Sequence, residues 1–160
     1  MTSHQIQTSL GTFKATFSER GLASLDFPRS GTSNAAESKN SSPAIELWKK
    51  NVATAIDQLA KGRVLTTLPP LDLTNGTEFQ RSVWGALKRV RHGATKTYAE
   101  IAREIGKPRA TRAVGTACGA NPIPIFIPCH RVLPKGGGLG GFSGGLDWKK
   151  KLLELEASAR

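Results

Sequence analysis

The sequence has few of the residues that hold small extracellular or metal-bound domains together. It contains two cysteines, Cys118 and Cys129, and three scattered histidines. A disulfide scaffold needs more cysteines, and a structural zinc site needs about four Cys or His ligands at short spacing. We therefore predict an intracellular protein without a structural metal, although the count alone permits one Cys118–Cys129 bridge.

Long apolar runs are also missing, and acidic residues are scarce. No stretch approaches the roughly 20 apolar residues of a membrane span, and the first residues lack an apolar run of signal-peptide length. We expect a cytoplasmic protein that does not bind membranes, associated with the nucleoid in a bacterium or located in the nucleus in a eukaryote. The 12 Asp and Glu residues face 23 Lys and Arg residues, for a net charge of +11.

That excess of positive charge is not evenly distributed. Residues 1–75 carry 8 basic and 6 acidic groups, whereas residues 76–160 carry 15 basic and 6 acidic groups. A basic surface of this kind attracts polyanions such as nucleic acid. The second half is therefore where the sequence predicts an anion-binding surface.

The pattern of the chain predicts an α+β protein with two domains, 1–72 and 73–160. The first domain contains three short segments of partial alternation, which predict an antiparallel meander: Gln5–Leu10, Thr12–Phe17 and Leu22–Phe27. Residues 28–42 are polar and small, which is typical of a flexible loop. Ser42 followed by Pro43 marks a helix start, and apolar residues at helical spacing continue it to about Gly62.

The second domain is predicted to be mostly helical. Thr77 with Gln80, and Thr97 with Glu100, have the spacing of capping boxes. A third helix is expected from about Arg109 to Gly119, after a turn that contains Gly106 and Pro108. Two helices joined by a tight turn and flanked by arginines indicate a helix-turn-helix. The alternative is that the small residues of the third helix serve only tight helix packing.

Cys129 is a candidate nucleophile. It lies in Asn121–Val132, a proline-rich segment that we expect to be extended and largely buried. His130 and Arg131 next to it offer a base or a positive charge. Adjacent residues of an extended chain point to opposite sides, so His130 would need a turn or a bridging water to reach the Cys129 sulfur. The alternative is a buried thiol beside a structural histidine, and we assign Cys118 to that class.

The end of the chain offers less specific signals. The glycine-rich run 136–145 lacks the pattern of a phosphate loop, so we interpret it as a pocket wall or a surface loop. In a last helix over about Leu146–Ala157, we expect Trp148, Leu152 and Leu155 on one side and Lys149, Lys150 and Lys151 on a solvated face. Glu156 opposes the helix dipole near the helix end, which suggests a specific partner such as a histidine.

Several motifs of the second half are found together, in the same order, in one known family. They are GTEFQRSVW (76–84), TYAEIA (97–102), RAVG (112–115), NPIPI (121–125), PCHRV (128–132) and SGG (143–145). They resemble the O6-alkylguanine-DNA alkyltransferases, also called methylated-DNA–protein-cysteine methyltransferases. The resemblance spans about residues 76–156, and the first half resembles the family's small α/β domain chiefly in element order.

The resemblance implies a DNA repair protein that moves an alkyl group onto Cys129, irreversibly and once per molecule. The group comes from O6 of guanine, or more weakly from O4 of thymine, in a base rotated out of the duplex. The resemblance implies that His130 acts as a base through a water molecule and that Glu156 orients His130. Tyr98 would hydrogen-bond the guanine and help to rotate the nucleotide.

The resemblance also implies how DNA is bound. A monomer would grip double-stranded DNA from the minor groove, with Arg112 inserted into the base stack. Further DNA contacts would come from Thr97, Ala110, Ala113, Gly115 and Arg131. The substrate pocket would contain Val132, Ser143, Phe142 and Asn121, of which Asn121 stabilises the hinge before Cys129. No cofactor is implied, and the cysteines that bind zinc in some members are missing from residues 1–75.

Two other functions compete with this one. A non-catalytic lesion sensor or regulator would use the same helix-turn-helix, but such members replace the nucleophile that is present here as Cys129. A Cys-His hydrolase of small substrates would explain neither Arg112 nor the uneven charge. The chain also departs from the common family pattern, with Phe142 at a frequent tyrosine position and Pro134-Lys135 in place of a small or polar pair.

Overall fold

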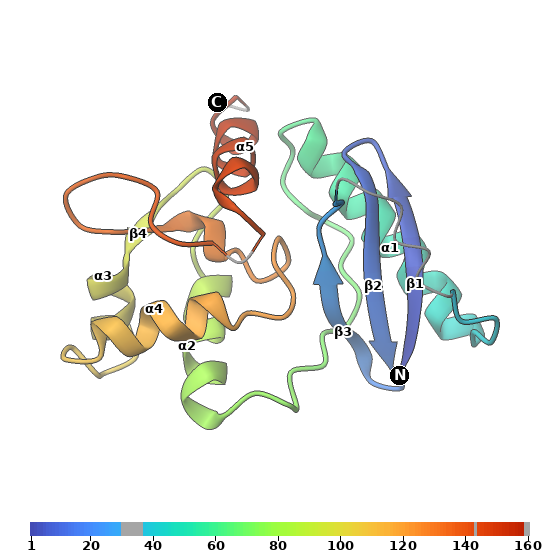
Figure 1. Ribbon diagram of the computed structural model, residues 1–160, viewed down its shortest axis with the longest axis horizontal. Helices are drawn as coiled ribbons and strands as arrows, with labels where there is room; N and C mark the ends of the chain where they lie inside the picture. Colours follow the sequence, from blue (N-terminus) through green and yellow to red (C-terminus); the bar gives the residue numbers. More distant parts are fainter. Residues whose placement is uncertain (30–36, 143, 159–160) are drawn as a thin grey trace. The chain divides into compact units, whose positions relative to one another are not determined.

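The structure is a computed structural model that describes residues 1–29, 37–142 and 144–158. The chain divides into two compact units, Met1–Leu73 and Thr74–Arg160 (Figure 1). An antiparallel three-stranded sheet lies in the first unit and most of the helices lie in the second. The predicted α+β class is therefore confirmed. Within the described residues, no helix has the length and apolarity needed to cross a membrane.

The first unit is a meander covered by one helix (Figure 1). Its strands are β1 (Thr2–Thr8), β2 (Gly11–Ser18) and β3 (Gly21–Asp26), in the order β1-β2-β3. Alternate residues of β2 are buried, as the period of a half-buried strand requires. The three predicted strands are thus present, with slightly different bounds. Residues 30–36 of the predicted loop lie outside the described residues.

The helix of the first unit, α1 (Pro43–Ala60), begins as its sequence predicts. The Ser42 hydroxyl accepts a hydrogen bond from the Ile45 amide, and proline occupies the first turn. Its buried residues are Val52, Ala55, Ile56 and Leu59. After α1 the chain returns to the sheet, where Gly21 has a φ of +148° and a β-carbon would collide with the Pro70 carbonyl. Glycine is therefore required at this contact.

The second unit contains four helices in its described part: α2 (Glu78–Lys88), α3 (Tyr98–Glu104), α4 (Thr111–Gly119) and α5 (Leu146–Ala157). Both predicted capping boxes are confirmed, Thr77 with Gln80 and Thr97 with Glu100. The start of α4 differs from the prediction. The Ala110 amide donates to the Lys107 carbonyl at 2.9 Å, so a turn precedes the helix and delays it by two residues.

A short parallel pairing connects two segments that are distant in sequence. Strand β4 (Lys96–Thr97) pairs with β5 (Val132–Leu133). Tyr98 follows β4 directly, and the 3-10 turn η1 (Cys129–Arg131) directly precedes β5. The pairing therefore brings the start of α3 close to the cysteine segment.

The segment before Cys129 is buried as predicted, but it is not extended. Its prolines prevent regular pairing, and Ile125 adopts a left-handed φ of 76°, which is uncommon for a β-branched residue. The chain consequently folds through turns and bends. It enters η1 at Cys129, so the expected geometry, with Cys129 and His130 on opposite sides of an extended chain, is wrong.

Candidate active site

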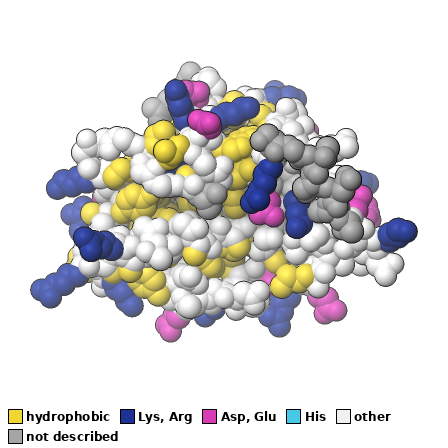
Figure 2. All heavy atoms as spheres, in the orientation of Figure 1, with side chains coloured by type: hydrophobic (Ala, Val, Ile, Leu, Met, Phe, Trp, Pro, Cys, Tyr) yellow, Lys and Arg dark blue, Asp and Glu magenta, His cyan; other side chains and the backbone are white. Residues whose placement is uncertain are grey.

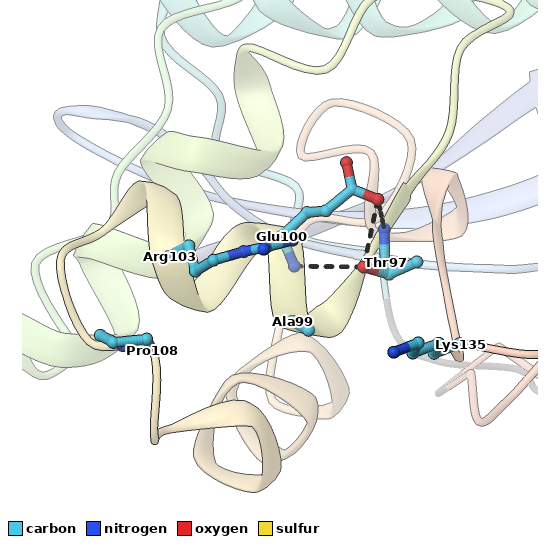
Figure 3. Close-up of a pocket in the computed structure, with 6 residues that line it drawn as sticks. All are labelled: Thr97, Ala99, Glu100, Arg103, Pro108 and Lys135. Carbon is cyan, nitrogen blue, oxygen red and sulfur yellow. Dashed lines mark hydrogen bonds between the residues drawn. The ribbon is translucent and has the colours of Figure 1, made fainter.

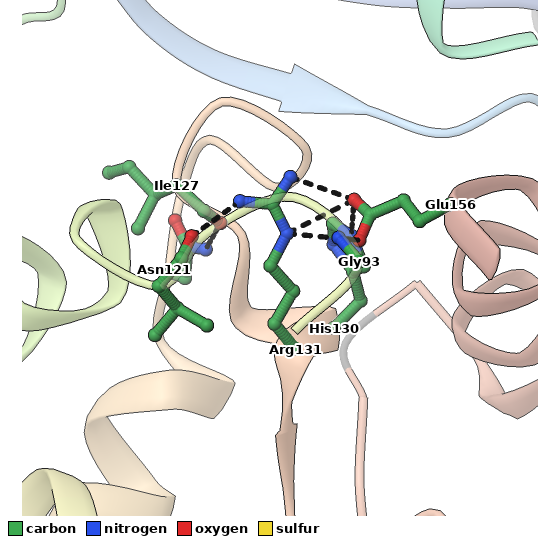
Figure 4. Close-up of polar contacts among 7 residues, drawn as sticks. Gly93, Asn121, Ile127, His130, Arg131 and Glu156 are labelled. Atoms are coloured by element: carbon green, nitrogen blue, oxygen red, sulfur yellow. Dashed lines mark hydrogen bonds and ion pairs between the residues drawn. The ribbon is translucent and has the colours of Figure 1, made fainter. Parts of the chain in front are cut away.

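Cys129 is held by a loop that one buried amide side chain braces. The Cys129 amide donates to the Ile127 carbonyl at 2.8 Å. The Asn121 Nδ2 donates to the same carbonyl at 2.8 Å (Figure 4). Asn121 Oδ1 accepts from the Ile123 amide at 2.9 Å. Asn121 thus fixes both ends of the turn that carries the thiol.

The Cys129 thiol lines a cavity of about 320 Å³. The cavity is formed by α3, α4, η1 and the glycine-rich loop, through Tyr98, Gly115, Cys118, Gly119, Cys129, Gly141 and Phe142. Four of these residues were predicted to belong to the site. Cys118 was not: it is buried, as expected, but it also faces the cavity. Both thiols are free, so they form no bridge.

A buried carboxylate stands behind the thiol segment. Glu156 Oε1 lies 2.6 Å from His130 Nε2, so the predicted pairing of these two residues is present (Figure 4). The same carboxylate accepts bonds from Arg131 Nε and Nη2 and from the Gly93 amide. His130 and Glu156 are 1% and 2% exposed. Solvent therefore does not screen the group.

Protonation in this cluster follows from burial and charge. Burial alone would raise the pKa of Glu156, but hydrogen bonds from His130 and Arg131, together with their charges, lower it to about 2. Burial lowers the pKa of His130, and the Glu156 partner offsets this only in part. A neutral His130 beside a charged Glu156 donates through Nε2, which leaves Nδ1 as the basic nitrogen. Nδ1 is buried and has no hydrogen-bond partner among the described residues.

Arg131 does not fit the DNA-binding role that we expected. Its guanidinium donates to Glu156 on one side and, through Nη1, to the Val90 carbonyl at 2.7 Å on the other. The residue is 9% exposed. Its donors are thus used inside the protein, and we assign Arg131 to the support of Glu156 instead.

The buried face of helix α5 contains two charged residues, Lys149 and Glu156, whereas the sequence predicted an apolar face. Its buried residues are Lys149, Leu152 and Glu156, whereas Trp148 and Leu155 are only half-buried. Lys149 was expected on the solvated face but is 1% exposed. Its Nζ donates to the Val132 carbonyl at 2.8 Å and to the Gly141 carbonyl at 3.3 Å. The seven-residue spacing to Glu156 was the available sequence signal, because it puts both residues on one helix face.

Burial also changes the pKa of Cys129 and of Tyr98, two of the groups that line the cavity. It raises the pKa of the Cys129 thiol, against the hydrogen bond from Asn121 and the charge of Lys149, which lower it. Burial likewise raises the pKa of Tyr98, so its hydroxyl keeps its proton and can donate. The cavity therefore combines a thiol with a neutral hydrogen-bond donor.

Three further residues, Val132, Phe142 and Ser143, were predicted to belong to the substrate pocket. Val132 is fully buried, and its carbonyl is the acceptor for Lys149. Phe142 lines the cavity. Ser143 lies outside the described residues.

Helix α4 presents small residues and one arginine outward. Arg112 and Ala113 are exposed, Ala110 and Gly115 are half-buried, and Val114 is buried. Lys and Arg side chains project on the left of Figure 2, where α3 and α4 lie in Figure 1. Exposed basic residues of this region include Arg103, Lys107 and Arg109.

A second hollow of about 380 Å³ lies at the start of α3 (Figure 3). It is lined by Thr97, Ala99, Glu100, Arg103, Pro108 and Lys135. The Thr97 hydroxyl caps α3 by accepting from the Glu100 amide at 3.1 Å, and the Glu100 carboxylate folds back on Thr97. The hydroxyl that we expected to contact DNA is therefore already part of the helix cap.

Comparisons with known proteins agree with this geometry. Residues 78–158 match the family model described as "6-O-methylguanine DNA methyltransferase, DNA binding domain". A methylated-DNA–protein-cysteine methyltransferase of Methanosarcina barkeri is 40% identical, with 94% of each chain covered. A crystal structure of Mycobacterium tuberculosis OGT in complex with DNA is 34% identical and has a TM-score of 0.81, covering 98% of this chain and 92% of that one.

A relative of the same name from Methanosarcina acetivorans is 58% identical over 83 residues, which cover 52% of this chain. The match spans about half the length of that relative, 53%. Together with the match to the Methanosarcina barkeri relative over nearly the whole chain, these findings show that the chain belongs to the 6-O-methylguanine DNA methyltransferase family.

Proposed function

We propose that the protein repairs DNA by transferring an alkyl group from O6 of guanine to the sulfur of Cys129. The observation that carries the proposal is the cavity that Cys129 shares with Tyr98, behind which His130 is bound to Glu156 at 2.6 Å. Transfer from O4 of thymine is a weaker activity of the same site. Residues 73–160 form the alkyltransferase domain.

The chemistry uses these residues in one displacement. The Cys129 proton passes through a water molecule to Nδ1 of His130, whose other nitrogen is held by Glu156. The sulfur attacks the alkyl carbon, an S–C bond forms, and the bond from that carbon to O6 breaks. The electron pair stays on the guanine, and the proton lost by the thiol replaces the alkyl group on the base. The Tyr98 hydroxyl stabilises the charge that develops on the base.

The product explains why each molecule acts once. A thioether has no leaving group that a neutral histidine and a tyrosine could expel. Cys129 therefore stays alkylated, and the protein is consumed in the reaction.

The substrate must leave the helix to react, because O6 within a duplex cannot reach a thiol that is 4% exposed. We infer that α4 enters the minor groove, where its small residues allow close approach and Arg112 fills the gap in the base stack. The basic excess of residues 76–160 supplies contacts to phosphate. A single protein molecule binds each lesion.

Mass spectrometry tests the proposal directly. Incubation with a duplex that contains O6-methylguanine is expected to add one methyl group to the Cys129 peptide, with no turnover beyond one equivalent. An unmethylated duplex is the control. An unchanged protein mass, or repeated turnover, would contradict the proposal.

Replacement of Arg112 by alanine tests the extrusion step. Single-turnover repair of the duplex lesion is expected to slow by about ten- to hundredfold, equivalent to about 1.4–2.8 kcal/mol of activation free energy. Reaction with the free alkylated base is expected to stay unchanged, because no base has to leave a stack. Arg109→Ala is the matched control, because Arg109 is also exposed and its replacement removes the same charge. Equal losses on both substrates would show that Arg112 does not act in extrusion.

A further inference from the structure

Lys149 is buried, unlike the two lysines that follow it in the sequence. It is 1% exposed, whereas Lys150 and Lys151 on the same helix are exposed. Lysines are rarely buried unless they are paired. Among the described residues no carboxylate forms a salt bridge with Lys149. Its contacts are the carbonyls of Val132 and Gly141, and its Nζ lies 6.0 Å from the centre of the Tyr98 ring.

These contacts connect two walls of the thiol cavity. Val132 follows η1 directly, and Gly141 lines the cavity from the glycine-rich loop. One ammonium group therefore ties the segment that carries Cys129 to the loop opposite it. A cation fixed by two carbonyls cannot turn away from the cavity as an exposed lysine would.

The other charges behind the thiol offset one another. Arg131 is paired with Glu156, and His130 is neutral because burial lowers its pKa. The titratable groups that face Cys129 are Tyr98 from α3, Cys118 from α4 and Lys149 from α5. Tyr98 and Cys118 are neutral when protonated and negative when deprotonated, so neither carries a positive charge. Of these three groups, Lys149 alone can stabilise a negative sulfur by its charge.

We propose that Lys149 is a positioning residue that sets the reactivity of Cys129, by holding a positive charge beside the sulfur and by fixing the cavity wall at Val132 and Gly141. The proposal rests on the proposed function for its biological meaning, but the thiolate that it describes is a property of the free protein. Lys149 keeps its proton throughout and forms no covalent bond.

The electrostatic effects agree with this assignment. The charge of Lys149 lowers the pKa of Cys129 against burial, and a nearby cation is a common means of activating a thiol. The coupling is reciprocal: burial lowers the pKa of Lys149, and the two cavity thiols raise it. With His130 alone, the positive charge near the thiolate would exist only while the imidazole held the transferred proton, whereas the Lys149 ammonium is charged before the transfer.

The test measures the reactivity of Cys129 without DNA. The rate of iodoacetamide addition to the Cys129 peptide is followed by mass spectrometry from neutral to alkaline pH. Lys149→Gln keeps a donor for the Val132 carbonyl but removes the charge, Lys149→Arg keeps the charge, and Lys150→Gln is the exposed control. For Lys149→Gln we expect the midpoint of the pH profile to rise by about one unit, with a roughly tenfold slower reaction at neutral pH. Lys149→Arg is expected to shift it much less, and Lys150→Gln not at all.

The alkaline plateau of the iodoacetamide rate distinguishes an effect of the Lys149 charge from a structural effect of the substitution. Well above the midpoint of each profile the thiol is ionised in every variant, so an electrostatic role predicts that Lys149→Gln approaches the wild-type rate there. A lower plateau with an unchanged midpoint would overturn the proposal. Failure of the wild type to accept methyl from DNA would instead overturn the proposed function and leave this profile unaffected.

A second measurement covers the case in which Lys149→Gln does not fold. The Lys149 ammonium is titrated by NMR in the wild type and in Cys129→Ser. Reciprocal coupling predicts that Lys149 loses its proton at lower pH when the thiolate is absent. Identical titration curves in the two folded proteins would overturn the proposal.

Discussion

A Cys129→Ser protein is expected to take up no alkyl group, while its free energy of unfolding changes by no more than about 1 kcal/mol. Sulfur and oxygen differ little in size, so the loop braced by Asn121 is retained. A serine hydroxyl stays protonated near neutral pH and is a weak nucleophile. Lesion binding should persist, because neither α4 nor the basic surface changes. Protein mass after incubation and a duplex-binding titration measure the two effects separately.

The second thiol provides the matched control for this prediction. Cys118 lines the same cavity, but burial and the neighbouring Cys129 raise its pKa to about 12, against the charge of Lys149. Cys118→Ser should therefore accept one alkyl group on Cys129 as the wild type does. Alkyl transfer that persists in Cys129→Ser, with the label on the Cys118 peptide, would mean that the nucleophile has been assigned to the wrong sulfur.

Glu156→Gln is expected to lower the free energy of unfolding by about 3–5 kcal/mol, the usual cost of removing one partner of a buried ion pair. The carboxylate neutralises Arg131, which is 9% exposed and cannot turn to solvent without unpacking. Alkyl transfer should also slow, because a neutral amide oxygen accepts from His130 more weakly than a carboxylate does and holds the ring less firmly in its tautomer. Denaturant unfolding measures the free energy of unfolding, and single-turnover kinetics measure the rate of alkyl transfer. Glu154→Gln on the exposed side of α5 should change stability by no more than about 0.5 kcal/mol, and similar losses in both variants would refute the specific role of Glu156.

The same carboxylate predicts how stability depends on pH. The pKa of Glu156 falls from 4.5 to about 2 on folding, so its contribution is complete above pH 4.5 and is lost as the pH falls through about 2. The wild type should therefore lose stability over this window more steeply than Glu156→Gln. Parallel acid-unfolding curves for the two proteins would show that the carboxylate is not held as described.

Local signals in the sequence were sufficient to predict most helix starts. Thr77 and Thr97 cap their helices through neighbouring residues, so the pattern contains the whole interaction. The two thiols are a different case. The sequence and its family resemblance predicted Cys129 as the nucleophile, but the presence of Cys118 in the same cavity depends on how α4 packs against α2 and α3.

The inward face of α5 could not be read from hydrophobic periodicity. The pattern of Trp148, Leu152 and Leu155 suggested an apolar face, yet a buried lysine and a buried glutamate flank Leu152. Their partners are backbone carbonyls and residues of η1, which no local pattern encodes. The left-handed Ile125 is similar, because the surrounding loop imposes its conformation and β-branched residues do not favour it.

The dependence of the thiol on α5 has a consequence for the order of protein synthesis. The ribosome makes Cys129 before it makes Lys149 and Glu156, and at roughly 5–20 residues per second the interval lasts on the order of seconds. During that interval the nascent chain contains the cysteine but neither of the charged residues that activate and orient its surroundings. The cavity around the sulfur is therefore complete only after the final helix has been made and has placed Lys149 and Glu156.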